Sequence, residues 1–381
     1  MSDPLKLVID GVIYQYQATG GISRLFTETL PRVCRLDEGV KITLLTTGSL
    51  RQQLPAHPRI SNLRIPDLTP YLRPAALWRH LEERVKQTWL SLWIGSGRGK
   101  IWHSTYFTLP PAWKGLQVVT VADMIYERFR DLFTGAASDQ FREQRKQCVL
   151  AADAVLCISE GTRRDVREFY QVNGERLHVV HLACSDCFRP LAAAYLLQEG
   201  GSMPPFFLYV GSRAHYKNFQ GLLTAYSKWR GRTDMRLLVV GPPWTSEEGR
   251  RLSGLGISGQ VELVTDVRDE ALCALYNQAA AFIYPSLYEG FGIPLLEAMA
   301  CGCPVIASRI PTTEEIAGDC CIYFELDRPD SLIDAFDKAV SEGRDGAMAQ
   351  AGLEHAGRFS WEKTAQGTLD VYRSLLQKGV L

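Results

Sequence analysis

The sequence has no excess of charge of either sign, because 42 lysines and arginines balance 42 aspartates and glutamates. Proteins that bind nucleic acid or anionic membranes by broad electrostatic attraction carry a basic excess, so the balance argues against both kinds of partner. The chain does not lack hydrophobic residues, which make up 46% of it and are enough to build a folded core. We therefore expect a globular protein that binds no nucleic acid.

Long apolar runs and targeting segments are missing too. No uncharged stretch approaches the roughly 18 apolar residues that a membrane-spanning helix needs. Residues 1–10 lack the basic region followed by an apolar region that marks a secretory leader. We expect a cytoplasmic protein, acting there or at the inner face of the membrane, with at most peripheral membrane contact.

In the cytoplasm the ten cysteines are expected to be thiols. Two histidines and two cysteines recur at every third position: His178, His181, Cys184 and Cys187. Such a cluster suggests a zinc site, but Leu177–Leu182 is predicted as a strand, where residues three apart point to opposite faces. The ligands would not converge, so no metal site is predicted.

Short apolar runs alternate with amphipathic stretches along the whole chain. Strands are predicted at Leu5–Asp10, Val40–Thr47, Ile101–Ser104, Gln117–Ala122, Ala154–Ile158, Leu177–Leu182, Phe206–Val210, Arg236–Val240, Val261–Val264, Ala280–Tyr284 and Pro304–Ala307. Helices are predicted at Asp139–Ala152, Glu160–Tyr170, Phe219–Trp229, Glu270–Gln278, Pro294–Cys301, Asp330–Ser341 and Trp361–Lys378. This alternation predicts α/β domains with parallel sheets covered by helices on both faces.

The alternation breaks between Ala183 and Pro205, a segment rich in glycine and proline that is predicted to connect two domains. The predicted limits are residues 1–185 and 186–360, followed by a closing helix at 361–381. The simplest architecture is two doubly wound Rossmann-like domains that face one another across a cleft.

The segment from Glu289 to Glu297 combines a strand end, a glycine-rich turn and a helix that begins near Pro294. Gly290 and Gly292 let a ligand approach the backbone, and free N–H groups at a helix start suit a diphosphate or sugar hydroxyls. The two glutamates are placed to accept hydrogen bonds from hydroxyls of one ligand. From the residues alone, two surface carboxylates around a turn are an equal alternative.

Arg213 and Lys217 form a second segment, between the strand at Phe206–Val210 and the following helix. A guanidinium fork and a mobile ammonium together suit a diphosphate. Taken alone, two solvated charges on a loop are the simpler interpretation.

The run from Pro285 to Ser308 closely resembles the Glu-x7-Glu signature of the family 4 retaining glycosyltransferases, which have the GT-B fold, and in particular bacterial polysaccharide-assembly enzymes. The resemblance implies that Glu297 binds the ribose hydroxyls of a nucleotide sugar and that Glu289 lies near the donor hexose. It assigns donor contacts to the residues around the helix start: Phe291, Gly292, Ile293 and Leu296. Arg213 and Lys217 correspond to a basic pair that neutralises the departing diphosphate.

The resemblance extends to the first domain, which it makes the acceptor-binding domain. Thr19-Gly20-Gly21-Ile22 resembles a Gly-Gly loop that faces the donor phosphates, so Gly20, Gly21 and Ile22 are expected donor contacts. Family members commonly have His-Asp where this chain has Ala122-Asp123. Asp123 is therefore the remaining polar residue there, expected to be catalytic, and His103 is a candidate to contact the sugar in place of the missing histidine.

One amphipathic pattern, at Trp78–Trp93, has two interpretations. The first is a helix whose apolar face covers the core; the second is a contact with the acceptor or a membrane surface. Glu82 and Glu83 favour the first, because acidic residues weaken binding to an anionic surface.

The expected activity is transfer of a hexose from a nucleotide diphosphate sugar to a hydroxyl of a glycan or lipid-linked acceptor, with retention, in polysaccharide biosynthesis. UDP-sugars such as UDP-glucose are favoured as donors, with GDP-mannose as the alternative. No cofactor is expected, and since the chain has no Asp-x-Asp motif, neither is a metal. A nucleotide-sugar epimerase or hydrolase of the same fold and a noncatalytic nucleotide-sugar binder remain as alternatives.

Overall fold

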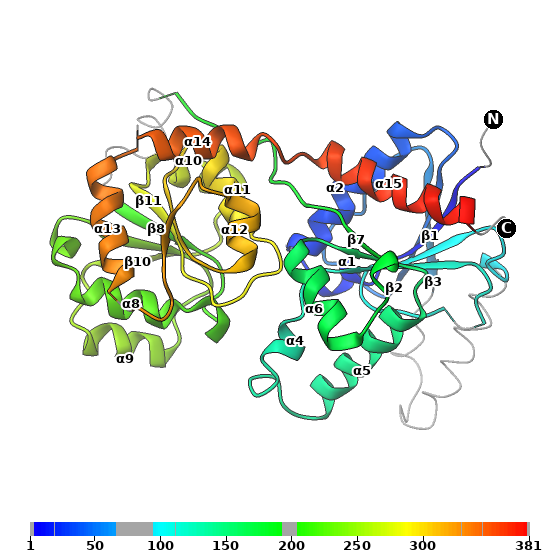
Figure 1. Cartoon of the computed structure of the whole chain (residues 1–381), viewed down its shortest axis with the longest axis horizontal. Coiled ribbons are helices and arrows are strands. Elements are labelled where there is room, and N and C mark those ends of the chain that lie inside the picture. The colour runs from blue at the N-terminus through cyan, green and yellow to red at the C-terminus, as the bar shows by residue number, and fades with distance from the viewer. Residues whose placement is uncertain are drawn as a thin grey trace. The chain divides into compact units, whose positions relative to one another are not determined.

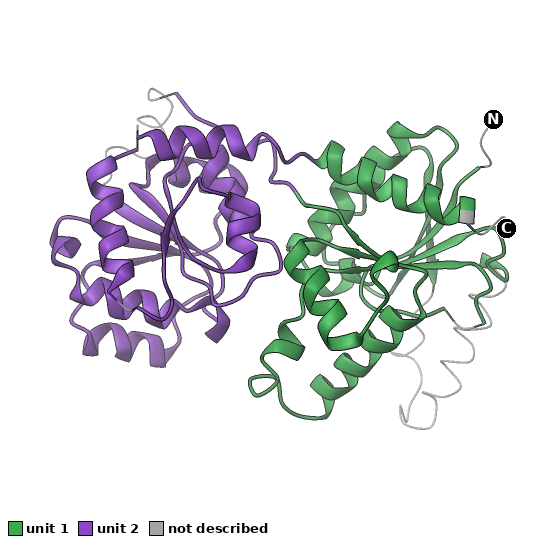
Figure 2. Cartoon of the chain, in the orientation of Figure 1, with its two compact units in different colours: residues 1–182, 361–381 green, residues 183–360 purple. Residues whose placement is uncertain are grey.

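The computed structural model describes residues 4–18, 20–65, 94–110, 112–192, 204–328, 330–344 and 346–378. The chain folds into two compact units (Figure 2). Unit 1 contains residues 1–182 and 361–381, and unit 2 contains residues 183–360. The predicted helix at Trp78–Trp93 lies outside the described residues, as does the middle of the predicted connection, residues 193–203.

The described part of unit 1 holds a parallel sheet of seven strands in the order β3-β2-β1-β4-β5-β6-β7. The strands are β1 (Lys6–Asp10), β2 (Lys41–Thr47), β3 (Ile60–Ile65), β4 (Ile101–Ser104), β5 (Leu116–Val121), β6 (Ala154–Cys157) and β7 (Leu177–Val179). The chain winds outward from β1 through β2 to β3 and then crosses to β4. The strand order therefore reverses between β1 and β4, and crevices for ligands form at the carboxyl ends of strands at such a point.

Helices cover both faces of this sheet (Figure 1). They are α1 (Ile13–Tyr16), α2 (Gly21–Leu36), α4 (Ile125–Arg128), α5 (Ala136–Ala151), α6 (Glu160–Tyr170) and α15 (Trp361–Lys378), with a 3-10 turn, η2 (Gly174–Arg176). On one face α5 and α6 pack on β5 and β6 through buried residues such as Val149, Val166 and Val155. On the other, α2 and α15 lie side by side, and Arg32 Nε donates to Glu362 Oε1 at 2.7 Å. The last helix therefore belongs to the first unit.

Unit 2 repeats the arrangement with six parallel strands among its described residues, in the order β10-β9-β8-β11-β12-β13. They are β8 (Phe206–Val210), β9 (Arg236–Val240), β10 (Val261–Val264), β11 (Ala281–Tyr284), β12 (Val305–Ser308) and β13 (Ile322–Phe324). The helices are α8 (Phe219–Lys228), α9 (Ser246–Gly254), α10 (Asp269–Gln278), α11 (Ile293–Ala300), α12 (Pro311–Ala317), α13 (Ser331–Glu342) and α14 (Ala347–Ala356), with 3-10 turns η3 (His215–Lys217) and η4 (Arg230–Thr233). Here the strand order reverses between β8 and β11.

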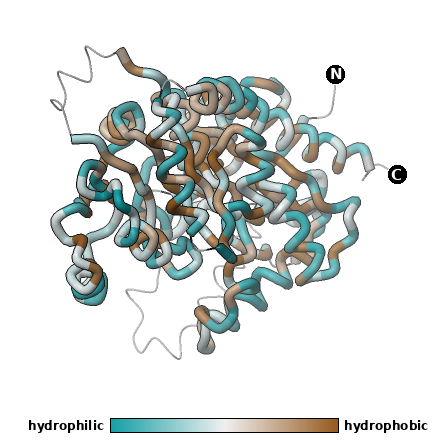
Figure 3. The backbone as a smooth tube through the Cα atoms, turned by 60° about the vertical axis from the view of Figure 1, so that its left-hand side comes forward, coloured by the Kyte–Doolittle hydropathy of each residue, from teal (hydrophilic) through white to brown (hydrophobic). Residues whose placement is uncertain are grey.

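Buried side chains on both faces of the second sheet form its core. Phe207 of β8 stacks on Phe336 of α13, with ring centroids 5.2 Å apart, and the Trp229 ring lies 5.3 Å from it. On the other face Tyr276 of α10 meets Phe282 of β11 edge to face. Figure 3 shows the same pattern as colour, with hydrophobic residues concentrated in the inner strands and hydrophilic residues along the outer helices.

The two doubly wound sheets confirm the predicted fold class. Every strand and helix that was predicted within the described residues is present to within a few residues, and Ser159 caps α6 by accepting a hydrogen bond from the Thr162 N–H at 3.0 Å. Two strands were not predicted. β3 lies at the sheet edge and is mostly polar, and β13 has three residues, so neither has a clear apolar run.

Candidate donor-binding site

The predicted donor residues of unit 2 meet where its strand order reverses. Arg213 and Lys217 follow β8, and Glu289 to Glu297 follow β11, and these two strands are neighbours in the sheet. Both loops leave the carboxyl ends of their strands, so the fold brings together two segments that lie about 75 residues apart in sequence. The structure therefore joins Lys217 and Glu289 in one site.

Glu289 is the centre of this site. Lys217 Nζ donates to both of its carboxylate oxygens, at 2.7 and 2.9 Å, and Ser286 Oγ donates to Oε1 at 2.6 Å. Thr312 Oγ1 anchors its backbone by donating to the Glu289 carbonyl at 2.9 Å. Burial raises the pKa of the neighbouring Tyr284 well above its ordinary value, and the charge of Glu289 adds to this effect. The carboxylate is thus fixed as an acceptor of hydrogen bonds, while one of the three Lys217 N–H donors remains for a ligand.

The start of α11 offers backbone donors beside this pair. Gly292 caps the helix with φ of 106°, a left-handed conformation that favours glycine, and Pro294 occupies the first turn. The structure records no hydrogen bond from the Gly292 or Ile293 N–H among the described residues. These two amides stand at the helix N-terminus, at the positive end of the helix dipole, where an anionic ligand is stabilised.

Glu297 lies one turn inside α11 and is buried, with 5% of its surface exposed. Tyr276 of α10 donates its hydroxyl hydrogen to Glu297 Oε2 at 3.2 Å. This contact fixes the Glu297 side chain within α11.

One of the predicted donor contacts needs correction, and another is limited to the backbone, as the resemblance implies. Leu296 is fully buried, and its N–H donates to the Gly292 carbonyl, so it belongs to the core of unit 2 and has no surface for a ligand. The Phe291 side chain is also buried and meets the Phe359 ring edge to face at 6.1 Å. Any donor contact of Phe291 therefore comes from its backbone.

The Arg213 side chain is buried and paired, whereas its position in a loop predicts an exposed side chain that binds the diphosphate. Its Nε donates to Glu248 Oε1 at 2.5 Å, and its Nη2 donates to the Pro243 carbonyl at 2.9 Å. The guanidinium also lies over the Trp244 ring, 4.6 Å from its centroid. Burial alone would raise the pKa of Glu248, but hydrogen bonds from Arg213 and Thr245 hold it below its usual value.

This ion pair leaves Arg213 with little capacity for a ligand. Its side chain is 5% exposed, and its Nη1 is buried without a hydrogen-bond partner among the described residues. Nη1 is therefore the atom through which Arg213 can still serve an anionic ligand, and the fork as a whole is a structural contact with α9.

In unit 1, Gly20 and Gly21 begin α2 directly after the α1 turn that follows β1. Ser23 N–H donates to Gln17 Oε1 at 3.2 Å, but no hydrogen bond is recorded from the Gly21 or Ile22 N–H within the described ranges. Like the start of α11, this helix start has amides that suit a phosphate.

Asp123 lies at the carboxyl end of β5, and its side chain is 31% exposed. Its Oδ1 accepts the Ile125 N–H at 3.1 Å, and Arg145 Nη1 donates to the Asp123 carbonyl at 3.0 Å. Arg145 is itself buried and forms an ion pair with Glu127. Asp123 is thus rigidly held and still accessible.

His103 does not contact a ligand, which corrects the prediction. It is 1% exposed, and its ring nitrogens pair with Tyr372 Oη at 2.5 Å and Thr120 Oγ1 at 2.8 Å. Burial lowers its pKa to about 3. The residue is a neutral core histidine beneath α2 and α15, with no nitrogen left for a sugar.

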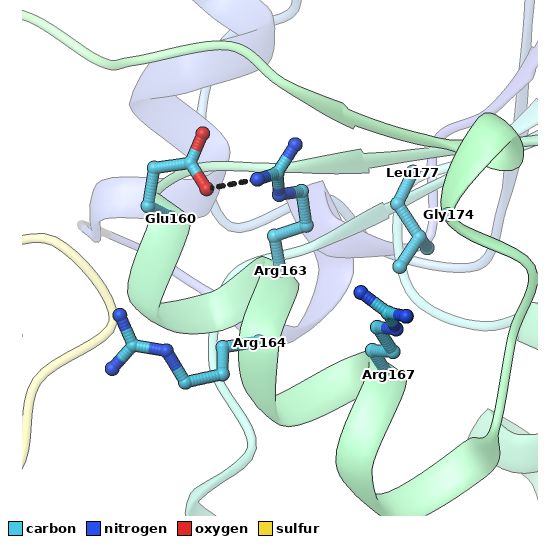
Figure 4. Close-up of a pocket in the computed structure, with 6 residues that line it drawn as sticks. All are labelled: Glu160, Arg163, Arg164, Arg167, Gly174 and Leu177. Carbon is cyan, nitrogen blue, oxygen red and sulfur yellow. Dashed lines mark ion pairs between the residues drawn. The ribbon is translucent and has the colours of Figure 1, made fainter.

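A separate cavity of about 450 Å³ lies beside α6 (Figure 4). It is lined by Glu160, Arg163, Arg164, Arg167, Gly174 and Leu177. Arg163 Nη2 pairs with Glu160 at 2.7 Å, so the lining is basic overall. None of the predicted donor-site residues lines this cavity. Within the described residues no three histidines, cysteines or carboxylates gather to hold a metal, and no helix is long and apolar enough to span a membrane.

The sequence interpretation missed several partners in the donor site. Glu248 had a signal, since Thr245-x-x-Glu248 is the pattern of a capping box, which the structure forms. Ser286 lies three residues before Glu289, but that spacing has no special meaning in a loop. Tyr276 is on another helix from Glu297, and sequence spacing gives no indication of their contact.

Comparison with known proteins agrees with this geometry. The profile of the family "Glycosyltransferase Family 4" matches residues 19–184, and that of "Glycosyl transferases group 1" matches residues 198–355. The chain is 28% identical to O-antigen chain mannosyltransferase B of Escherichia coli, over 97% of this chain and 100% of that protein. It is 26% identical to O-antigen chain mannosyltransferase RfbU of Salmonella typhimurium, over 69% of this chain and 72% of the relative.

Among solved structures, sucrose-phosphate synthase from Thermosynechococcus elongatus superimposes with a TM-score of 0.76. The match covers 98% of this chain and 100% of that one at 18% identity, a level that supports the fold alone. Since family profiles match both halves of the sequence and both units have the expected doubly wound sheets, the chain belongs to the family 4, group 1 glycosyltransferases and has the GT-B fold.

Proposed function

We propose that this glycosyltransferase moves a mannosyl residue from GDP-mannose to a hydroxyl of a growing polysaccharide, with retention at the anomeric carbon and without a metal. The observation that carries the proposal is the Lys217–Glu289 pair beside the helix-start amides of Gly292 and Ile293, because it combines donors for a diphosphate with an acceptor for sugar hydroxyls.

Stabilising the negative charge on the departing diphosphate is the largest task in such a transfer. The remaining Lys217 N–H, the amides at the start of α11 and Arg213 Nη1 are the donors that unit 2 offers for it. These donors make up for the missing divalent cation in the proposed mechanism.

Retention needs no protein nucleophile if the leaving phosphate oxygen takes the proton of the acceptor hydroxyl. Glu289 is suited to bind the sugar and not to act as the nucleophile, since its two carboxylate oxygens already accept hydrogen bonds from Lys217 and Ser286. We propose that it binds hexose hydroxyls and that Glu297 binds the ribose.

The donor is the point on which the proposal moves away from the sequence expectation of UDP-glucose. The full-length likeness to an O-antigen mannosyltransferase favours a mannosyl donor. The same relative supports a glycan acceptor, free or lipid-linked, and we keep the cytoplasm or the inner membrane face as the proposed place of action.

A donor screen tests the proposal. The purified chain is incubated with GDP-mannose, UDP-glucose or UDP-galactose and mannose oligosaccharides, in EDTA, and released nucleoside diphosphate and product anomers are followed by NMR. GDP release that requires the acceptor, with an α-mannoside as product, is the expected result. Turnover with UDP-glucose but not with GDP-mannose contradicts the mannosyl assignment. GDP release without acceptor indicates a hydrolase.

A further inference from the structure

An aromatic patch at the carboxyl edge of the unit 1 sheet has no role in the donor site. It is a chain of five rings in ring-to-ring contact: Tyr16, Tyr106, Phe141, Tyr126 and Phe133. Successive centroids lie 5.2, 5.6, 4.7 and 4.3 Å apart. These residues come from four segments of the chain, after β1, after β4, and around α4 and α5, so the fold assembles the patch.

The patch lies where the strand order of unit 1 reverses. Tyr16 ends α1, which follows β1, and Tyr106 follows β4 by two residues. β1 and β4 are neighbours in the sheet and mark the reversal. Ligands of doubly wound domains bind at the carboxyl ends of strands at this point, so the patch is at the position where a ligand of unit 1 is expected.

The inner side of the patch is filled and rigid. Arg145 is 2% exposed and lies beneath Phe141 and Tyr126, 5.0 and 5.6 Å from the ring centroids. The Gln144 side chain fixes the neighbouring loop by donating to the Phe107 carbonyl at 2.9 Å. Its outer side is open, since Tyr16 is 62% exposed and Tyr106 and Tyr126 are partly exposed. Such a large exposed aromatic surface on a rigid base is typical of a recognition surface.

The chemical groups of the patch indicate which class of ligand it binds. Asp123 lies close enough for its charge to raise the pKa of Tyr106, after the larger effect of burial. Asp123 Oδ1 also lies 3.9 Å from Nη1 of Arg145, so its charge is paired and the carboxylate acts as a hydrogen-bond acceptor. A pyranose ring has C–H groups that pack on aromatic faces and hydroxyls that donate to a carboxylate. Tyrosine hydroxyls add polar contacts that a lipid chain does not use.

We propose that the aromatic patch and Asp123 form the subsite for a pyranose ring of the glycan acceptor. This inference rests on the proposed function in one respect, namely that the acceptor is a glycan. In this subsite the sugar packs on Tyr16 and Tyr106, and Asp123 accepts hydrogen bonds from its hydroxyls, which orients the ring. Asp123 then acts in binding the acceptor.

Saturation-transfer NMR on the full chain tests the subsite, with methyl α-D-mannoside and α-mannobiose as probes. Tyr16→Ala removes an exposed ring at little risk to folding, and we expect it to weaken mannobiose binding about five- to tenfold. Tyr16→Phe keeps the ring and should bind within about twofold of the wild type. Leu150→Ala removes an exposed apolar side chain elsewhere in unit 1 and should leave binding unchanged.

The same samples are titrated with GDP and UDP, which separates this inference from the donor assignment. Nucleotide binding that is equal in Tyr16→Ala and the wild type, together with weaker mannobiose binding, supports the subsite. Equal mannobiose binding by Tyr16→Ala and the wild type overturns the proposed subsite. The subsite is also overturned if the wild-type protein binds nucleotide but neither methyl α-D-mannoside nor mannobiose. Loss of nucleotide binding in all samples with mannobiose still bound contradicts the donor assignment and leaves the subsite standing.

Discussion

At the scale of single residues, the donor site is defined by charges that neutralise one another. Lys217 and Glu289 are both largely buried and share two hydrogen bonds, so each holds the other in place in the absence of a ligand. A diphosphate entering this site meets a lysine that is already positioned. The structure thus gives Lys217 a preorganised position, which is the property that a donor to a transition state needs.

Lys217→Ala is expected to lower the turnover number by about a hundredfold or more, because it removes one donor to the departing diphosphate. Initial rates of nucleoside diphosphate release measure the effect. Lys228→Ala, an exposed lysine at the end of α8, is the matched control and should be near normal. A Lys217→Ala enzyme with nearly the wild-type rate would remove the residue from the mechanism.

Arg213→Ala is expected to lower stability more clearly than it lowers catalysis. The substitution leaves the buried Glu248 carboxylate without its partner, and breaking a buried ion pair costs about 3 kcal/mol or more. Urea unfolding gives the free energy, and the double variant Arg213→Met/Glu248→Met should regain much of it. Full stability in Arg213→Ala contradicts the structural role.

His103 gives a pH-dependent contribution to stability with a definite sign. Its pKa is about 3 in the folded protein and roughly 6.5 when unfolded, so the unfolded chain binds the extra proton first. This contribution is complete above pH 6.5 and decreases as the pH falls toward 3, by up to about 1.4 kcal/mol per pH unit. Urea unfolding between pH 7 and pH 4.5 should show a steeper loss for the wild type than for His103→Gln. Parallel profiles would be inconsistent with a neutral buried imidazole.

At the scale of elements, the helix starts explain why the chain needs glycine in the site. Gly292 has the left-handed backbone that begins α11, and this conformation sets the positions of the Gly292 and Ile293 amides. A Cβ at Gly292 would meet no atom closer than 3.5 Å, so strain there would come from the backbone angle and not from crowding.

Gly292→Ala is therefore expected to weaken binding of the nucleoside diphosphate while unit 2 stays folded. The left-handed angle costs roughly 1–2 kcal/mol in a residue with a Cβ, and relief of that strain moves the amides. Calorimetric titration with GDP measures the affinity. Gly249→Ala, within α9 and with open space around its Cβ position, is the control that should bind GDP normally. An unchanged affinity in Gly292→Ala would mean that these amides do not bind the phosphates.

At the scale of the whole molecule, the last helix completes the first unit. α15 supplies Tyr372 to His103, Glu362 to Arg32 and Arg373 to Asp37, and Trp361 is 2% exposed. The first unit is therefore built from two parts of the chain, separated by the whole of unit 2.

A chain that ends at Ser360 should lose the folded state of unit 1 and keep that of unit 2. The truncation exposes the core around His103 and removes the buried aromatic side chains of Trp361 and Tyr372, each worth about 3 kcal/mol or more. Calorimetry should show two transitions in the full chain and only one in the truncated chain. A chain that ends at Lys378 keeps α15 and serves as the control. Retention of both transitions after truncation at Ser360 would contradict the assignment of α15 to unit 1.

The sequence by itself determined the elements and the donor signature, because these depend on local patterns. Buried parallel strands are short apolar runs, and the turn before α11 needs glycine at Gly292 and accepts proline at Pro294. Mostly polar or very short elements such as β3 and β13 have no such pattern, so they could not be predicted.

Tertiary structure alone decided what each site residue contacts. It paired Lys217 with Glu289 across 72 residues, committed Arg213 to Glu248, and enclosed His103 beneath a helix 269 residues away. The same folding gathered five aromatic rings from four segments into one surface. These outcomes depend on the strand order and on which helices cover each face, and no spacing along the chain encodes them.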